Sequence, residues 1–157
     1  MSEASMREAA RAVREGKTIV FPTDTVYGLG CDPFNIDAVQ RLMAIKKRTG
    51  APLPILVASL EHARQIGSFN AKAECLARAF WPGALTLVVP DVSNLPVEVT
   101  GSNGTVGLLI LDGGRANLGF ESTVVAVDAD IVQVLREGAI PSEKVFATIA
   151  LSAGTPE

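Results

Sequence analysis

The sequence predicts a single α/β domain over residues 1–157, a twisted mixed sheet covered by helices. The length suits one hydrophobic core of ordinary size. Helical and strand patterns alternate in the first half of the chain and strands cluster in the second half, which favours a mixed sheet. The expected strands are almost wholly apolar, as is typical of strands buried on both faces.

Five segments carry apolar residues at helical spacing. In the first, Met6, Ala9 and Val13 share one face. Asn35 is expected to cap the second helix, and Pro141 is well placed to open the last. The helices are predicted at Ala4–Glu15, Ile36–Lys47, Leu60–Ile66, Ala71–Phe80 and from Pro141 to about Ala150.

Short apolar runs between these helices are predicted to be strands. The last two are separated only by Asp-Ala-Asp at 128–130, which is suited to a hairpin turn. The strands are expected at Thr18–Phe21, Leu53–Ala58, Leu85–Val89, Thr105–Leu111, Ser122–Val127 and Ile131–Leu135.

Composition narrows the classes of function. Hydrophobic residues make up 48% of the chain, charged residues 20%, and the net charge is −3, which does not favour nucleic-acid binding through global charge. No apolar run approaches the ~20 residues of a membrane span, and no signal peptide is seen. We therefore expect a cytoplasmic protein that does not associate with a membrane. Cys31 and Cys75 are expected to be reduced thiols. His62 is the one histidine, which excludes a histidine-rich zinc site, and we expect it to be an ordinary surface residue.

The stretch Pro22-Thr-Asp-Thr-Val-Tyr-Gly-Leu-Gly30 follows a predicted strand and precedes a helix. Open α/β sheets bind ligands at such strand ends. Its hydroxyl and carboxylate side chains suit ligand binding, and Gly28 and Gly30 let the backbone turn sharply or approach a ligand closely. The alternative is a plain polar turn, because Thr and Asp are common turn formers.

A run of cations from Arg41 to Arg48 contains no acidic residue. Cations at 46–48 close the second predicted helix, where they also suit the helix dipole. They suit a phosphate clamp equally well, since arginine and lysine both bind phosphate oxygens. Neither interpretation excludes the other.

These stretches together resemble the YrdC/TsaC-like family of threonylcarbamoyl-AMP synthases. The resemblance spans nearly the whole chain and keeps the order of the blocks. The matching blocks are Pro22–Gly30 with 46–48 (Lys-Lys-Arg), Pro52-Leu-Pro-Ile-Leu-Val57, Phe80-Trp-Pro-Gly-Ala-Leu-Thr86, Gly119-Phe-Glu-Ser-Thr-Val-Val125 and Leu135-Arg-Glu-Gly-Ala139.

The resemblance implies a YrdC-like fold with a basic concave ligand cavity. It implies that the chain makes threonylcarbamoyl-AMP and pyrophosphate from L-threonine, bicarbonate and ATP, the first step toward t6A in tRNA. Mg²⁺ would be bound through the phosphates and not by a protein site. Further implied partners are tRNA or double-stranded RNA and other enzymes of the t6A pathway.

The same resemblance assigns residues to that site. It places Thr25, Tyr27 and Ser122 beside the threonine. It places Lys46, Arg48 and Arg136 beside the nucleotide, with Lys46 and Arg48 as the catalytic cations. Arg136 alternatively pairs with a carboxylate or solvent, and Ser122 is alternatively a mere strand hydroxyl. Trp81 is expected to pack against the sheet, and Asp112-Gly-Gly114 to form a turn without chemistry.

The chain departs from the family pattern after Gly107. Family members continue that strand into Arg and Pro and later present a Ser-x-Asn motif, whereas here Gly107 runs straight into Leu108. We therefore expect a domain shortened by at least one strand–helix–strand unit, on the order of 30 residues or more. A family histidine after the Leu-Val strand is replaced by Ala58-Ser59. The alternatives to a synthase are a non-catalytic nucleotide- or RNA-binding module and an inactive, internally deleted chain.

Overall fold

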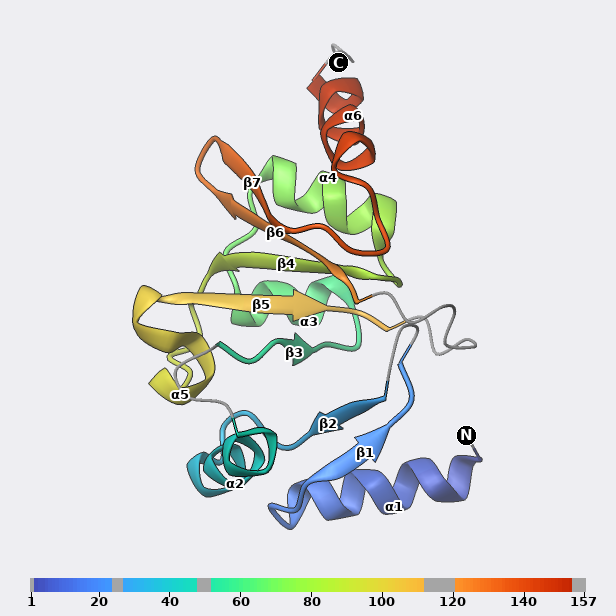
Figure 1. Cartoon of the computed structure of the whole chain (residues 1–157), viewed down its shortest axis with the longest axis vertical. Helices are drawn as coiled ribbons and strands as arrows, with labels where there is room; N and C mark the ends of the chain where they lie inside the picture. Colours follow the sequence, from blue (N-terminus) through green and yellow to red (C-terminus); the bar gives the residue numbers. More distant parts are fainter. Residues whose placement is uncertain (1, 24–26, 48–51, 112–120, 154–157) are drawn as a thin grey trace.

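A five-stranded mixed sheet forms the centre of the fold, in the order β3-β5-β4-β6-β7 (Figure 1). Strand β5 runs parallel to β3 and antiparallel to β4, while β4 is parallel to β6 and β6 forms an antiparallel hairpin with β7. This computed structural model describes residues 2–23, 27–47, 52–111 and 121–153. The strands are β3 (Ile55–Leu56), β4 (Leu85–Pro90), β5 (Thr105–Leu109), β6 (Thr123–Asp128) and β7 (Ile131–Arg136).

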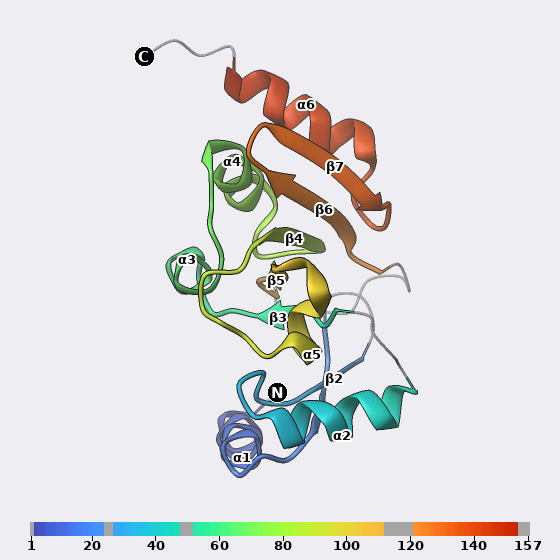
Figure 2. The ribbon, with the colours of Figure 1, turned by 90° about the vertical axis from the view of Figure 1, so that its left-hand side faces the viewer.

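Helices cover one face of this sheet. Figure 2 views the sheet nearly along its edge, with α3 (Leu60–Ile66) and α4 (Ala71–Phe80) on the same side. The C-terminal helix α6 (Ser142–Ala153) packs against α4. Both α3 and α4 begin at capping side chains, Ser59 and Asn70, which accept hydrogen bonds from backbone N–H groups three residues on.

A smaller lobe lies beside the β3 edge. It contains α1 (Glu3–Arg14), the antiparallel pair β1 (Ile19–Phe21) and β2 (Gly28–Gly30), and α2 (Ile36–Lys46). The predicted cap is present, because Asn35 Oδ1 accepts a hydrogen bond of 3.1 Å from the Ala38 N–H. The short helices α5 (Val97–Thr100) and η1 (Gly101–Asn103) lie between β4 and β5 in sequence, and α5 packs against α2.

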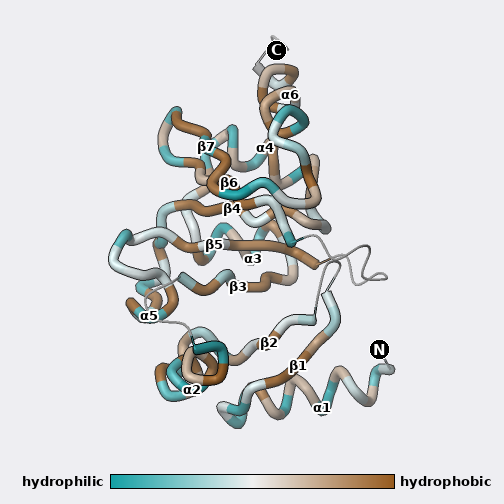
Figure 3. Tube along the Cα trace, in the orientation of Figure 1, coloured by the Kyte–Doolittle hydropathy of each residue, from teal (hydrophilic) through white to brown (hydrophobic). Residues whose placement is uncertain are grey.

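Alternation along the central strands separates the core from the other face of the sheet. On β4, Leu85, Leu87 and Val89 are fully buried. Val106 and Leu108 of β5 are equally buried. The hydrophobic colouring of β4 and β5 in Figure 3 follows this core. Most residues on both faces of these two strands are buried, as predicted, whereas β7 at the sheet edge is mostly exposed.

Most of the predicted elements are confirmed, within a few residues at their ends. The second predicted strand is wrong in length, because only Ile55–Leu56 of Leu53–Ala58 pairs with a neighbour. Strand β2 and helix α5 were not predicted. The sequence junction between Gly107 and Leu108 lies inside the continuous strand β5.

The sharp turn predicted at Gly28 and Gly30 is not observed, whereas their predicted close approach to a ligand stays a prediction. Both lie in the extended strand β2, and neither has a positive φ. The ring of Phe21, on the paired strand β1, covers them: a Cβ at Gly28 would lie 2.6 Å from its Cζ, and one at Gly30 2.8 Å from its Cε1. These glycines therefore make room for an aromatic ring of the chain itself.

Candidate active site between the lobes

A cavity of about 790 Å³ lies between the small lobe and the sheet, and His62 and Ile66 of α3 also contribute to its wall. The small lobe contributes β2 and α2 to its wall, and the sheet contributes residues of β4, β5, β6 and β7. Most of the sheet wall is apolar, with polar side chains at the ends of β4, β6 and β7. The size and the mixed lining are those of a small-molecule site.

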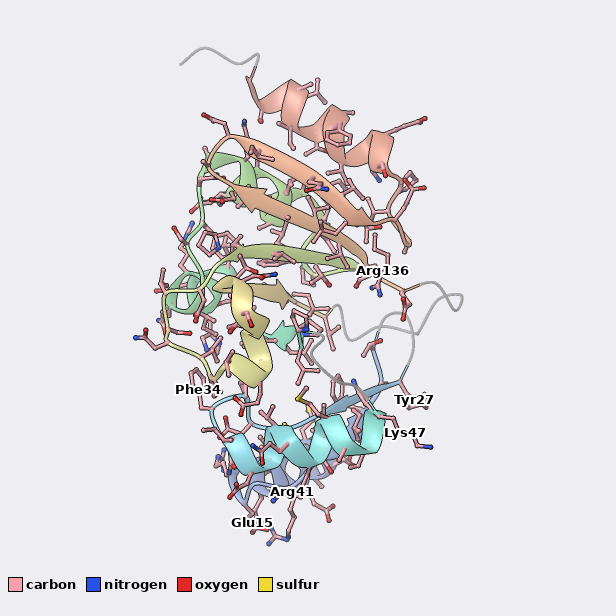
Figure 4. The ribbon with its side chains drawn as sticks, turned by 60° about the vertical axis from the view of Figure 1, so that its left-hand side comes forward. Glu15, Tyr27, Phe34, Arg41, Lys47 and Arg136 are labelled. Carbon is pink, nitrogen blue, oxygen red and sulfur yellow. The ribbon has the colours of Figure 1, made fainter. Side chains whose placement is uncertain are left out.

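Two predicted site residues line the cavity from the small lobe. Tyr27, just before β2, is 76% exposed, and Lys46 is the last residue of α2. Thr25 and Arg48 lie outside the described residues. Figure 4 shows Tyr27 and Lys47 on the small lobe and Arg136 at the facing end of the sheet.

Ser122 and Thr86 bring two hydroxyl groups to the sheet wall. The Thr86 Oγ1 and Ser122 Oγ atoms are 2.9 Å apart and hydrogen-bonded. Thr86 is 5% exposed and lies on β4, and its parallel pairing with β6 puts Ser122 at the adjacent strand end. The Oγ atom of Ser122 therefore belongs to a hydrogen-bonded hydroxyl pair in the cavity wall, and its predicted contact with threonine stays a prediction.

Arg136 lies at the end of β7 and also lines the cavity. Its Nη2 and Nε atoms donate to the Ser122 carbonyl oxygen, at 2.9 and 3.3 Å. Its Nη1 atom forms an ion pair of 2.6 Å with Glu121 Oε2. The carboxylate partner that the sequence analysis gave as an alternative for Arg136 is therefore present, and it is Glu121 in the cavity wall.

A buried threonine fixes the backbone around Arg136. The Thr123 hydroxyl accepts hydrogen bonds from the Gly138 and Ile140 N–H groups, at 2.9 and 3.0 Å, and donates to the Ile140 carbonyl at 2.6 Å. Any Cβ at Gly138 would collide with the Glu121 carbonyl, so the two segments lie in close contact. The Glu-Ser-Thr and Arg-Glu-Gly-Ala blocks are therefore two halves of one structural unit.

Charges of both signs line the described part of the cavity. The cations are Lys46 and Arg136, and the carboxylates are Asp32 and Glu121. Arg48, on which the prediction of a basic cavity also depends, is not among the described residues, so that prediction stays a prediction. Burial raises the pKa of the Cys31 thiol in this wall, and neighbouring Asp32 raises it further, while Arg41 and Lys46 act in the opposite sense.

Several wall residues were given no role from the sequence. Thr86 and Glu121 stand inside the quoted family blocks, and the period of two along β4 separates Thr86 from its buried neighbours Leu85 and Leu87. His62, expected at the surface, is exposed but also borders the cavity, as does Asn103 of η1. Trp81 packs beside the core as predicted, donating from Nε1 to the Leu85 carbonyl at 2.8 Å.

Among the described residues, no cluster of three or more His, Cys, Asp or Glu side chains is arranged to hold a metal ion. Over the same residues, no helix is long and apolar enough to cross a membrane.

Residues 11–110 match the sequence pattern of the Sua5/YciO/YrdC family, whose description reads "Telomere recombination". This match covers well over half of the chain and includes β1, β2, α2 and the sheet strands up to β5. The chain belongs to the Sua5/YciO/YrdC family. The expected YrdC-like α/β fold is thereby confirmed.

Curated relatives of this family member carry the name threonylcarbamoyl-AMP synthase. The Pyrococcus abyssi protein is 31% identical over 198 residues, with 95% of this chain and 58% of the relative aligned. The Coxiella burnetii protein is 39% identical over 108 residues, covering 68% of this chain and 58% of the relative. The chain therefore spans less than two thirds of the length of these relatives.

Solved structures share the fold. The crystal structure of Pyrococcus abyssi Sua5 complexed with L-threonine has a TM-score of 0.86 at 31% identity, covering 95% of this chain and 58% of that one. The Escherichia coli YciO structure has a TM-score of 0.80 at 18% identity, covering 92% and 94%, and at that identity it speaks for the fold alone.

The alignment with the Pyrococcus protein extends over more positions than this family member has residues, 198 against 157. The relative therefore carries positions that have no counterpart here. The match to the family pattern ends at residue 110, close to the Gly107–Leu108 junction.

Proposed function

We propose that this chain is an L-threonylcarbamoyladenylate synthase. It would form threonylcarbamoyl-AMP and pyrophosphate from L-threonine, bicarbonate and ATP, on the route to t6A in tRNA. The observation that carries the proposal is the cavity wall, where Tyr27, Lys46, Ser122 and Arg136 come together from four separate sequence blocks. Family membership and the synthase names of the relatives support the same reaction.

The proposed reaction needs no protein nucleophile. The threonine amine and bicarbonate condense to a carbamate with loss of water, and a carbamate oxygen then attacks the α-phosphorus of ATP, from which pyrophosphate leaves. The protein has to align two anions and stabilise charge on the phosphates. Mg²⁺ would be carried by the phosphates, and the protein's part is cationic and hydrogen-bonding side chains.

Each wall of the cavity has a part in this scheme. L-threonine is proposed to contact Tyr27, Ser122 and Thr25, of which Thr25 lies outside the described residues. The Thr86–Ser122 hydroxyl pair offers hydrogen-bond donors and acceptors to a small polar substrate. Lys46, Arg48 and Arg136 are proposed to bind the nucleotide phosphates, with Lys46 and Arg48 nearest the transferred group.

The shortened chain leaves a second candidate. Because positions of the Pyrococcus relative have no counterpart here, contacts to the nucleotide that such positions provide would be lost. A family member that still binds nucleotide, tRNA or double-stranded RNA without turnover would be a non-catalytic binding module. Salt-sensitive RNA binding without pyrophosphate release is its signature.

The first test is pyrophosphate release from ATP, with L-threonine and bicarbonate compared against L-serine and bicarbonate. Lys46→Gln and Arg48→Ala are expected to lower the rate about 10- to 100-fold, the value of a charge-assisted hydrogen bond. Lys47→Gln is the matched control, because Lys47 follows Lys46 directly and stands outside the cavity wall. No threonine-dependent release from well-folded protein would refute the synthase and leave the binding module.

A further inference from the structure

Glu121 contacts the one guanidinium nitrogen of Arg136 that is not hydrogen-bonded to Ser122. Nε and Nη2 are bound to the Ser122 carbonyl, so Nη1 is the nitrogen left for an anionic partner. Glu121 Oε2 forms an ion pair with Nη1 at 2.6 Å. Both side chains line the cavity, so the ion pair lies where the proposed phosphates would bind.

Arg136 does not need Glu121 to keep its place. The Ser122 carbonyl accepts two of its N–H groups, and Ser122 Oγ lies within 3.4 Å of Nη2. Its backbone continues into the segment that Thr123 binds through the Gly138 and Ile140 N–H groups. Removing the charge of Glu121 therefore leaves the guanidinium anchored, with Nη1 available to another anion.

Glu121 is held much less firmly than Arg136. Its side chain is 60% exposed against 43% for Arg136, and its carboxylate makes no other hydrogen bond or ion pair among the described residues. Exposed pairs of this kind contribute little to stability. A ligand oxygen of higher charge can therefore displace the carboxylate into solvent.

We infer that Glu121 is a built-in competitor for Arg136, occupying the guanidinium edge that a phosphate group of the ligand takes when it binds. The inference rests on the proposed function, because it takes Arg136 to face the phosphates of a nucleotide. Glu121 thereby weakens anion binding and disfavours ligands too weakly charged to displace it. This role differs from positioning, in which the loss of Glu121 would weaken binding.

The test is the affinity of the full chain for inorganic pyrophosphate, measured by calorimetry for the wild type and for Glu121→Gln. Neutralising the competitor is expected to tighten binding about two- to five-fold, the usual range for an exposed ion pair. Glu143→Gln is the control: Glu143 is exposed on α6, has no ion pair among the described residues, and changes net charge equally. Arg136→Gln and the double variant Glu121→Gln/Arg136→Gln should bind equally weakly.

A second readout follows Arg136 itself. The Nε–H signal of Arg136 in a nitrogen-15 spectrum should shift on addition of pyrophosphate, and at lower concentration in Glu121→Gln than in the wild type. Equal or weaker binding by Glu121→Gln, or pyrophosphate binding by none of these proteins, overturns the inference. The proposed function is judged separately by threonine-dependent turnover: it can fail while Glu121→Gln still binds pyrophosphate more tightly, and it can stand when that gain is missing.

Discussion

Replacing Thr123 by valine tests whether one buried hydroxyl holds the site's sheet wall together. Valine has nearly the shape of threonine, so the change removes hydrogen bonds without leaving a cavity. Thr123 is fully buried, and its hydroxyl accepts from two backbone N–H groups and donates to one carbonyl, all in the segment that follows Arg136. The effect of the variant therefore measures those bonds.

The expected loss follows from these contacts. Each net hydrogen bond is worth about 0.5–1.5 kcal/mol, and a donor left unsatisfied in the interior costs more. Gly138 and Ile140 are only half-buried, so water can reach their N–H groups and limit the penalty. We expect Thr123→Val to lower the free energy of unfolding by about 2–3 kcal/mol.

The assay is urea unfolding followed by circular dichroism, with Thr123→Ser as the comparison. Serine keeps the hydroxyl and loses one buried methyl group, which should cost about 1 kcal/mol. Thr148→Val is a further control, because the Thr148 hydroxyl makes one hydrogen bond, to the Lys144 carbonyl within α6. This variant should change the free energy of unfolding by less than about 0.5 kcal/mol. A larger loss for serine than for valine would refute the reasoning, since packing would then outweigh the hydrogen bonds.

Three further changes probe the small lobe and the helix layer. Gly28→Ala should cost about 1–3 kcal/mol in thermal or urea unfolding because its Cβ meets the Phe21 ring, and Phe21→Leu in the same chain should recover part of that loss; additive costs would contradict the contact. Asn35→Ala should lower the free energy of unfolding by about 1 kcal/mol through loss of the α2 cap, while Asn35→Asp should stay near wild type. Equal losses of stability in the two variants would show that the side-chain cap does not stabilise α2. The pKa of Glu74 is lowered from 4.5, chiefly by the hydrogen bond from Arg64, so its stabilisation is complete above 4.5 and is lost as the pH falls through the lower folded value. Glu74→Gln should therefore cost at most about 1 kcal/mol near pH 7 and progressively less as the pH falls below 4.5, and a cost independent of pH would contradict the ion pair.

The sequence carries much of the fold because local signals and burial agree. Helices α3 and α4 end where the apolar period and the breaking residues predict, and the β6–β7 hairpin follows from its short polar turn. Strand β2 escaped prediction because its three residues include two glycines, which are poor strand formers. It exists because the residues pair with β1 beneath the ring of Phe21, and that is a tertiary contact.

The candidate site was predicted in its residue types but not in its contacts. Tyr27, Lys46, Ser122 and Arg136 all border the cavity, whereas the roles assigned to them stay predictions. The Glu121–Arg136 pair depends on a register shift between β6 and β7 at Val124 and Val125, which no local pattern encodes. Thr86 could have been found, since alternation along its strand sets it on the face away from the core.

The most direct test of the central claim is detection of the product itself. The chain is incubated with ATP, L-threonine and carbon-13 bicarbonate, and the mixture is analysed by mass spectrometry. The expected product is threonylcarbamoyl-AMP with one carbon-13 atom, formed with an equal amount of pyrophosphate, and its yield should fall in Lys46→Gln but not in Lys47→Gln. Bound ATP and threonine with no labelled adenylate would contradict the account.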